Sequence, residues 1–248
     1  MTGLPGFDVL VARLASHRQL DIADLSRSAE IPESELRAVF EGTVPSPSLL
    51  RRLAPVLQLH AADLFVIADV PVPDDLAPLD ARARELVAGL VKDAVALPPE
   101  HVRRLRRLAC SLPQENRTEP VRTVRVHEQS ERGPGGVLIG MAGHRNLSWS
   151  GIARTFLCLT GRYWAASTYG VVGSGRKELT PDLLTDFSTV LGVPVGTLSV
   201  LTGVDVPDGP PPRNPVAVDM AELLWDVRRL TVDQVRQVGD MARAPLRD

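Results

Sequence analysis

The chain of 248 residues is 44% hydrophobic and 23% charged, values close to those of soluble globular proteins, which excludes a wholly disordered chain. Its formal net charge of −2 excludes a global electrostatic attraction to nucleic acid, so any DNA binding must come from a local patch. The two cysteines, Cys110 and Cys158, lie far apart, which argues against a disulfide framework or a thiolate zinc site. The length allows two domains, each with its own core.

The N-terminus lacks a basic segment followed by an apolar core, and no run of about 18 apolar residues occurs in the chain. We therefore expect a cytoplasmic protein with no membrane partner. Charge is unevenly distributed, because residues 1–80 carry 6 basic and 12 acidic side chains, whereas residues 134–204 carry 5 and 3. The second half is therefore the better candidate for contact with a polyanion.

Short helices are predicted along the first part of the chain. An apolar stripe with helical spacing is formed by Phe7, Leu10, Val11 and Leu14. Asp21 is suited to cap a helix over 22–28, and Pro32 to begin a helix over 33–40 that stops at Gly42. Ser46 can cap a leucine-rich helix, and "HAADLFVIA" supplies one more. Residues 82–92 and 99–110 then predict a helical hairpin appended to this bundle.

The sequence repeats itself at long range. "HRQLDIADL" (17–25) is echoed by "HRNLSWSGI" (144–152), "FVIADVPVPDD" (65–75) by "SVLTGVDVPDG" (199–209), and "LPPEHVRRL" (97–105) by "LTVDQVRQV" (230–238). Three echoes in the same order predict a duplicated unit. We expect an N-terminal copy over 1–112, a linker over 113–135 in which "VRTVRV" is a possible short strand or extended arm, and a C-terminal copy over 136–248.

The first copy resembles the Cro/CI-type helix-turn-helix proteins, also called the XRE family, over Phe7–Ala68. The resemblance is carried by a capped helix, a tight turn, a second helix ending in glycine and the leucine-rich helix after "PSPS". It assigns core positions to Ala23, Leu25, Ile31, Leu36, Val39, Leu53 and Leu59. The chain departs from the family pattern at Ile22, where glutamine is usual, and at Glu33, Glu35 and Arg37 in the DNA-reading helix, where polar or basic residues are usual.

The second copy resembles the same family in "LSWSGIART" (147–155) and "WAASTYGVVGSGRK" (164–177). The alignment places extra residues in the turn, around "LCLTGRYW", and assigns core positions to Tyr169 and Val172. It implies a DNA-binding set of Ser148, Arg162, Ser167, Thr168, Arg176 and Lys177. Arginine can bind phosphates or guanine edges, hydroxyls can contact bases, and the helix start at Ser148 can offer backbone N–H groups to a phosphate.

The acids of the first copy disfavour DNA contact there. A glutamate near a phosphate costs about 1 to 4 kcal/mol, which offsets much of the roughly 4 to 10 kcal/mol that separates specific from non-specific binding. Glu33 and Glu35 could instead accept from cytosine N4, or this copy could be a dimerisation or protein-docking surface.

We therefore expect an all-α protein of two tandem helix-turn-helix bundles, lambda-repressor-like, each followed by a helical hairpin. The resemblance implies a transcriptional regulator that binds double-stranded DNA and forms a homodimer or binds a partner protein. Because the N-terminal copy is acidic, we expect the C-terminal copy to make most of the DNA contacts. The alternative is a protein–protein interaction module without a DNA site. We find no residues that predict an enzyme and expect no cofactor. The five histidines lack metal-ligand spacing, and a helix-dipole interaction explains the repeat-equivalent pair His17 and His144 without a metal.

Overall fold

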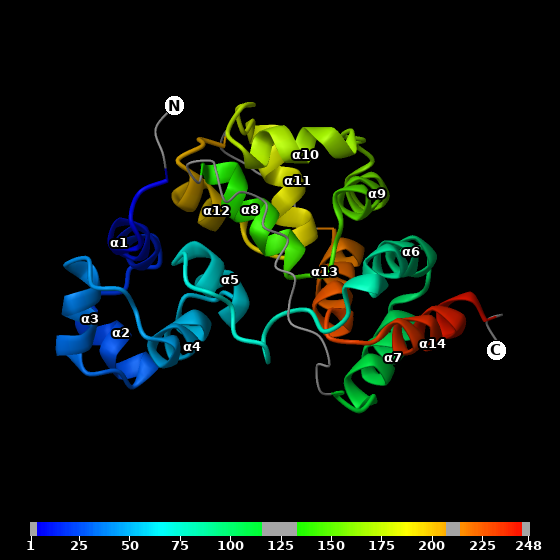
Figure 1. Ribbon diagram of the computed structural model, residues 1–248, viewed down its shortest axis with the longest axis horizontal. Coiled ribbons are helices and arrows are strands. Elements are labelled where there is room, and N and C mark those ends of the chain that lie inside the picture. Colours follow the sequence, from blue (N-terminus) through cyan, green and yellow to red (C-terminus); the bar gives the residue numbers. More distant parts are fainter. Residues whose placement is uncertain (1–3, 116–132, 207–213, 245–248) are drawn as a thin grey trace.

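The computed structural model describes residues 4–115, 133–206 and 214–244, and every regular element in these ranges is helical (Figure 1). The expected all-α class is thus confirmed for the described residues. The possible strand in "VRTVRV" (121–126) lies outside them. None of the described helices is long and apolar enough to cross a membrane.

The first five helices form one unit, with predicted boundaries close to those observed. They are α1 (Phe7–His17), α2 (Ile22–Ala29), α3 (Glu33–Phe40), α4 (Pro47–Val56) and α5 (Ala61–Ile67). Both predicted caps are made, since Asp21 Oδ1 accepts from the Asp24 N–H at 2.7 Å and Ser46 Oγ accepts from the Leu49 N–H at 3.1 Å. The predicted core positions are buried, except that Ala23 is partly exposed.

The second unit repeats this helix order. It consists of α8 (Pro134–Gly143), α9 (Trp149–Thr160), α10 (Ala166–Gly173), α11 (Pro181–Leu191) and α12 (Val195–Thr202). Helix α9 has 12 residues where α2 has 8, so the prediction that all extra residues lie in the turn was wrong. The helix continues for one turn beyond its last buried residue, Phe156, and ends at Gly161, with a left-handed φ of 70°.

The turns of the two units correspond one to one. In the first unit the left-handed residues, in chain order, are Gln19, Glu30, Gly42, Gln58 and Asp69. In the second unit they are Asn146, Gly161, Gly175, Gly192 and Gly203. Each member follows the equivalent helix of its unit. Since left-handed backbone is rare outside glycine, this shared turn pattern is what a duplicated unit predicts.

Two equivalent pairs of helices form the contact between the units. Helix α1 lies against α12, and α5 lies against α8. The hairpin helices, η1 (Ala81–Ala83), α6 (Arg84–Ala94), α7 (Pro99–Ser111), α13 (Pro215–Val227) and α14 (Val232–Arg243), follow the same rule, because α7 packs on α13 and α6 on α14. The halves are therefore related by an approximate two-fold, as in an isologous dimer.

The hairpins do not pack as the sequence suggested. Helices α6 and α7 were expected to be appended to their own bundle, but they form a four-helix arrangement with α13 and α14 (Figure 1). This four-helix arrangement packs against the second unit, since α6 also contacts α9 and α13 contacts α11. The two-fold relation is thus broken around the hairpins, and the second unit is the more enclosed of the two.

A buried ion pair joins the two units. The Arg145 guanidinium donates to both Asp63 carboxylate oxygens at 2.8 and 2.9 Å, and both side chains are fully buried. The same guanidinium donates to the carbonyl oxygens of Met141 and Leu191 at 2.9 and 2.7 Å. Four such bonds compensate for desolvating the pair, which a single contact would not do.

The Trp225 ring, from α13, lies over the arginine of this pair. The Trp225 ring stacks on His60 at 3.6 Å, the Arg228 guanidinium lies 3.4 Å from the ring centroid, and Arg145 lies 5.5 Å from it. His144 lies nearby and is half-buried, and desolvation lowers its pKa to about 4. The expected dipole interaction is therefore corrected for His144, because a neutral imidazole carries no charge to place at a helix end.

Close contact between α8 and α10 makes Gly135 sensitive to substitution. A Cβ there would collide with the Val172 carbonyl oxygen and lie 2.6 Å from its Cγ1. Gly135→Ala should therefore lower the free energy of unfolding by about 1 to 3 kcal/mol, measured by urea denaturation. Gly143→Ala is the matched control, since no atom lies within 4 Å of its added Cβ. Equal stability of the two variants would contradict this packing.

Candidate nucleic-acid interface

The predicted DNA-binding residues of the second unit stand at the ends of two helices: Ser148 before α9, Arg162 after it, Ser167 and Thr168 at the start of α10, and Arg176 and Lys177 after its end. Tyr169 and Val172 are buried, as predicted, and form the inner face of α10. Ser167 is accordingly exposed and Thr168 half-buried. Trp149, the first residue of α9, lies against Gly170 of α10 and remains 41% exposed.

The start of α9 is occupied by a carboxylate from α6. Ser148 Oγ accepts from the Gly151 N–H at 3.0 Å as predicted for a cap, but it also donates to Glu85 Oε1 at 2.6 Å. Ser150 donates to the same oxygen at 2.9 Å, and Arg154 pairs with the other oxygen at 3.1 Å. The hydrogen bond from Ser148 lowers the pKa of Glu85, so this carboxylate is charged at neutral pH. A phosphate arriving here would meet a negative charge.

Arg162 lies in the turn before α10 and has acidic neighbours. Its guanidinium is 3.1 Å from Asp182 and 3.9 Å from Asp186, while the side chain is 46% exposed. Asp186 accepts from Trp164 Nε1 at 2.8 Å, and burial raises the pKa of Asp186. Arg162 is thus reachable from solvent, but part of its charge is balanced within the protein.

Arg176 and Lys177 follow α10 and are both exposed. Arg176 Nε donates to Ser174 Oγ at 2.9 Å, and Lys177 Nζ lies 5.5 Å from the centroid of the Trp164 ring. Neither cation forms a salt bridge with a carboxylate of any described residue. Of the predicted cations, these two have the charge most available to an anion.

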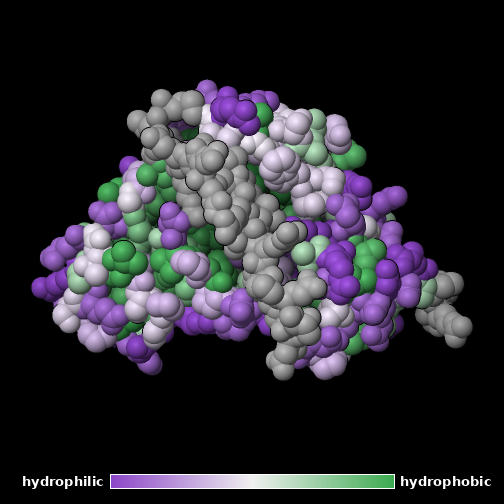
Figure 2. Space-filling view, in the orientation of Figure 1, coloured by the Kyte–Doolittle hydropathy of each residue, from purple (hydrophilic) through white to green (hydrophobic). Residues whose placement is uncertain are grey.

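The equivalent helix of the first unit presents acids. Glu33 and Glu35 on α3 are exposed, and Arg37 is paired with Glu33 at 2.8 Å. Glu35 accepts from Ser46 Oγ at 3.3 Å. The outer edge of this unit, where α2 and α3 lie, is largely hydrophilic (Figure 2). Its polarity is suited to water or a cationic partner.

Sequence reasoning missed Glu85, because its partners lie 63 and 65 residues further along the chain. It also missed the Arg145–Asp63 pair, although Arg145 stands in the repeated "HR" that marked the duplication. Among the residues that the structure describes, no group of three or more His, Cys, Asp or Glu side chains is arranged to hold a metal. Comparison with models of protein families, with curated proteins and with solved structures finds no match to the chain.

Proposed function

We propose that the chain is a transcriptional regulator with two tandem helix-turn-helix units, which binds duplex DNA through the second. In this proposal α9 and α10 are the two helices of the motif, and α10 is the helix that enters the major groove. The observation that carries it is the difference between the reading helices. Helix α10 bears no acid and is followed by two exposed cations, Arg176 and Lys177, whereas α3 exposes Glu33 and Glu35.

The proposed contacts differ in kind. Ser167 and Thr168 at the start of α10 contact base edges, while Arg176 and Lys177 neutralise phosphates. Arg162 contributes less, since Asp182 shares its charge. Ser148 is not part of the proposed surface because its hydroxyl is bound to Glu85. The acidic first unit then serves the assembly rather than the DNA.

Glu85 favours a second candidate function. A carboxylate at the start of α9 repels a phosphate where the resemblance would place one, by at most about 1 to 4 kcal/mol, since Arg154 balances part of its charge. With the glutamates of α3, it favours a protein–protein interaction module built on degenerate helix-turn-helix units. In that case neither reading helix contacts nucleic acid.

Substitution of Arg176 and Lys177 by glutamine is expected to weaken DNA binding. With the full chain and a labelled random duplex in fluorescence anisotropy, the double variant should bind about tenfold more weakly at low salt. The slope of log affinity against log salt should fall by about 2, because two phosphate contacts are lost. The matched control is Arg103→Gln with Arg104→Gln, which removes the same charge from exposed positions on α7.

One outcome would count against the proposed surface, and another against DNA binding itself. An equal loss in the control variant would mean that only net charge matters, and not the surface after α10. No measurable complex with the unaltered chain at about 50 mM salt, where non-specific binding is strong, would favour the interaction module.

A further inference from the structure

The approximate two-fold places Arg18 opposite Thr197, as it places Arg145 opposite Asp63. Each arginine follows the last residues of the first helix in its unit, in the repeated "HR". Asp63 is the third residue of α5 and Thr197 the third residue of α12. The same contact is therefore built twice, once with a carboxylate and once with a neutral hydroxyl.

The two guanidinium groups have unequal partners. Arg145 donates to two carboxylate oxygens and two carbonyl oxygens. Among the described residues, Arg18 makes one long hydrogen bond, from Nη2 to Thr197 Oγ1 at 3.5 Å, whereas the Nε atom is buried without a described partner in both arginines. Burial lowers the pKa of Arg18, as expected for a partly desolvated cation with no facing carboxylate. No ion pair in the described part of the chain offsets this charge.

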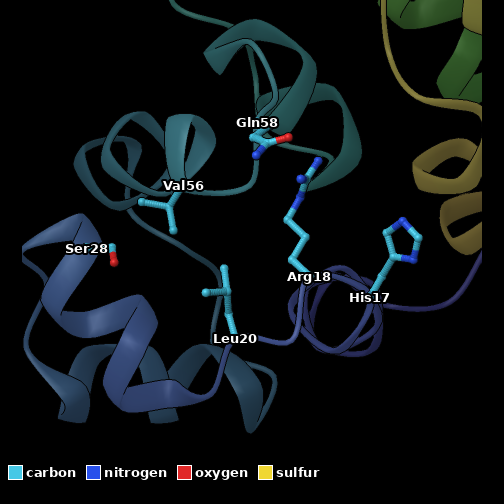
Figure 3. A pocket seen from close by; sticks show the side chains of 6 residues that line it. All are labelled: His17, Arg18, Leu20, Ser28, Val56 and Gln58. Atoms are coloured by element: carbon cyan, nitrogen blue, oxygen red, sulfur yellow. The ribbon is translucent and has the colours of Figure 1, made fainter.

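An open pocket of about 430 Å³ lies beside Arg18 (Figure 3). It is lined by His17, Arg18, Leu20, Ser28, Val56 and Gln58. The Arg18 side chain rises from α1 toward the Gln58 amide, which follows α4 (Figure 3). In the second unit, Trp225 from α13 lies over the equivalent arginine. Because the hairpins pack against the second unit, the pocket beside Arg18 in the first unit stays open to solvent.

We propose that this pocket binds a small organic carboxylate, held on the Arg18 guanidinium as the Asp63 carboxylate is held on Arg145. Two parallel N–H···O bonds are the geometry in which arginine binds carboxylates best. Ser28 and Gln58 offer hydrogen bonds to a hydroxyl or carbonyl of the ligand. Leu20 and Val56 supply apolar contact for a short carbon chain.

Thermal melting of the full chain in sodium lactate tests this site, with sodium chloride at equal ionic strength as the reference. Lactate should raise the Tm with the logarithm of its concentration once this exceeds Kd, by about 3 °C when the concentration reaches about ten times Kd. Arg18→Gln should weaken binding at least about tenfold, since it removes a charge-assisted pair. Arg13→Gln, which removes an exposed arginine from α1, is the matched control and should leave the response unchanged.

Thr197→Asp gives an independent test that keeps Arg18. The introduced carboxylate would compete for the guanidinium, as Asp63 does in the other unit, so the lactate response should disappear. Thr197→Asn, which adds no charge, should retain it. The proposal fails if lactate gives no rise beyond sodium chloride, or if Arg18→Gln or Thr197→Asp responds like the unaltered chain. A rise of equal size with sodium phosphate would overturn the assignment to carboxylates.

Discussion

Arg145→Met is expected to lower the free energy of unfolding by about 3 to 5 kcal/mol, measured by urea denaturation of the full chain. The substitution leaves the fully buried Asp63 carboxylate without its cation. It also leaves the Leu191 carbonyl oxygen without the hydrogen bond from Arg145 at 2.7 Å. A buried charge without a partner is costly, whereas the paired state is compensated by its four bonds.

The two-fold supplies a control for this prediction. Arg18→Met makes the same chemical change at the equivalent position, where the guanidinium makes a single hydrogen bond, 3.5 Å long, to the part of the chain that the structure describes. We expect a change below about 1 kcal/mol there, as for other partly exposed charges. Combining Asp63→Leu with Arg145→Met should restore part of the stability, because both charges are then gone. Similar losses for Arg18→Met and Arg145→Met would refute the distinction between the two sites.

Lowering the pH from about 7 to about 4 should destabilise the protein through His60 and His144. Burial lowers the pKa of each imidazole to about 4 from an ordinary value of 6.5. The charges of Arg145 and Arg228 act in the same direction, and Asp63 opposes them. The folded state therefore binds fewer protons than the unfolded state between these values, and stability is lost as the pH falls from 6.5 toward 4.

Each of these histidines contributes on the order of 3 kcal/mol to this loss, from 1.36 kcal/mol per pKa unit. The measurement is the free energy of unfolding in urea at about pH 7 and at about pH 4.5. At the lower pH the unfolded state still binds more protons than the folded state. His144→Asn should flatten the dependence relative to the unaltered chain. His17→Asn, at the repeat-equivalent and exposed position, should not. A pH dependence that is the same in both variants would contradict the assignment, because carboxylate titration is common to both.

Much of the local structure was predictable from residue order. Asp21 and Ser46 cap α2 and α4 as their positions predicted. Tyr169 and Val172 are buried, which confirms the placement of α10. These predictions held because caps and helical periodicity depend on residues three or four apart, whose chemistry is visible in any short window.

The candidate site was only partly predictable. Arg176 and Lys177, which the resemblance placed in the DNA-binding set, are exposed. The length of α9 was missed, because the residue that ends it, Gly161, lies one turn beyond the position equivalent to Glu30, which ends α2. The acidic partners of Ser148 and Arg162 were also missed, since no local pattern relates these residues to Glu85 or Asp182.

By itself, the sequence determined the all-helical class of the described residues, the caps and the repeated order of helices. Those features follow from hydrophobic spacing and short-range hydrogen bonds. Only the tertiary structure decided that Arg145 meets Asp63, 82 residues away, while its equivalent Arg18 meets a threonine. The physical reason is that charge pairing depends on which surfaces of the two units come into contact and on where the hairpins pack. Both the contact surfaces and the hairpin positions result from the packing of the whole chain, so no short segment of sequence reveals them.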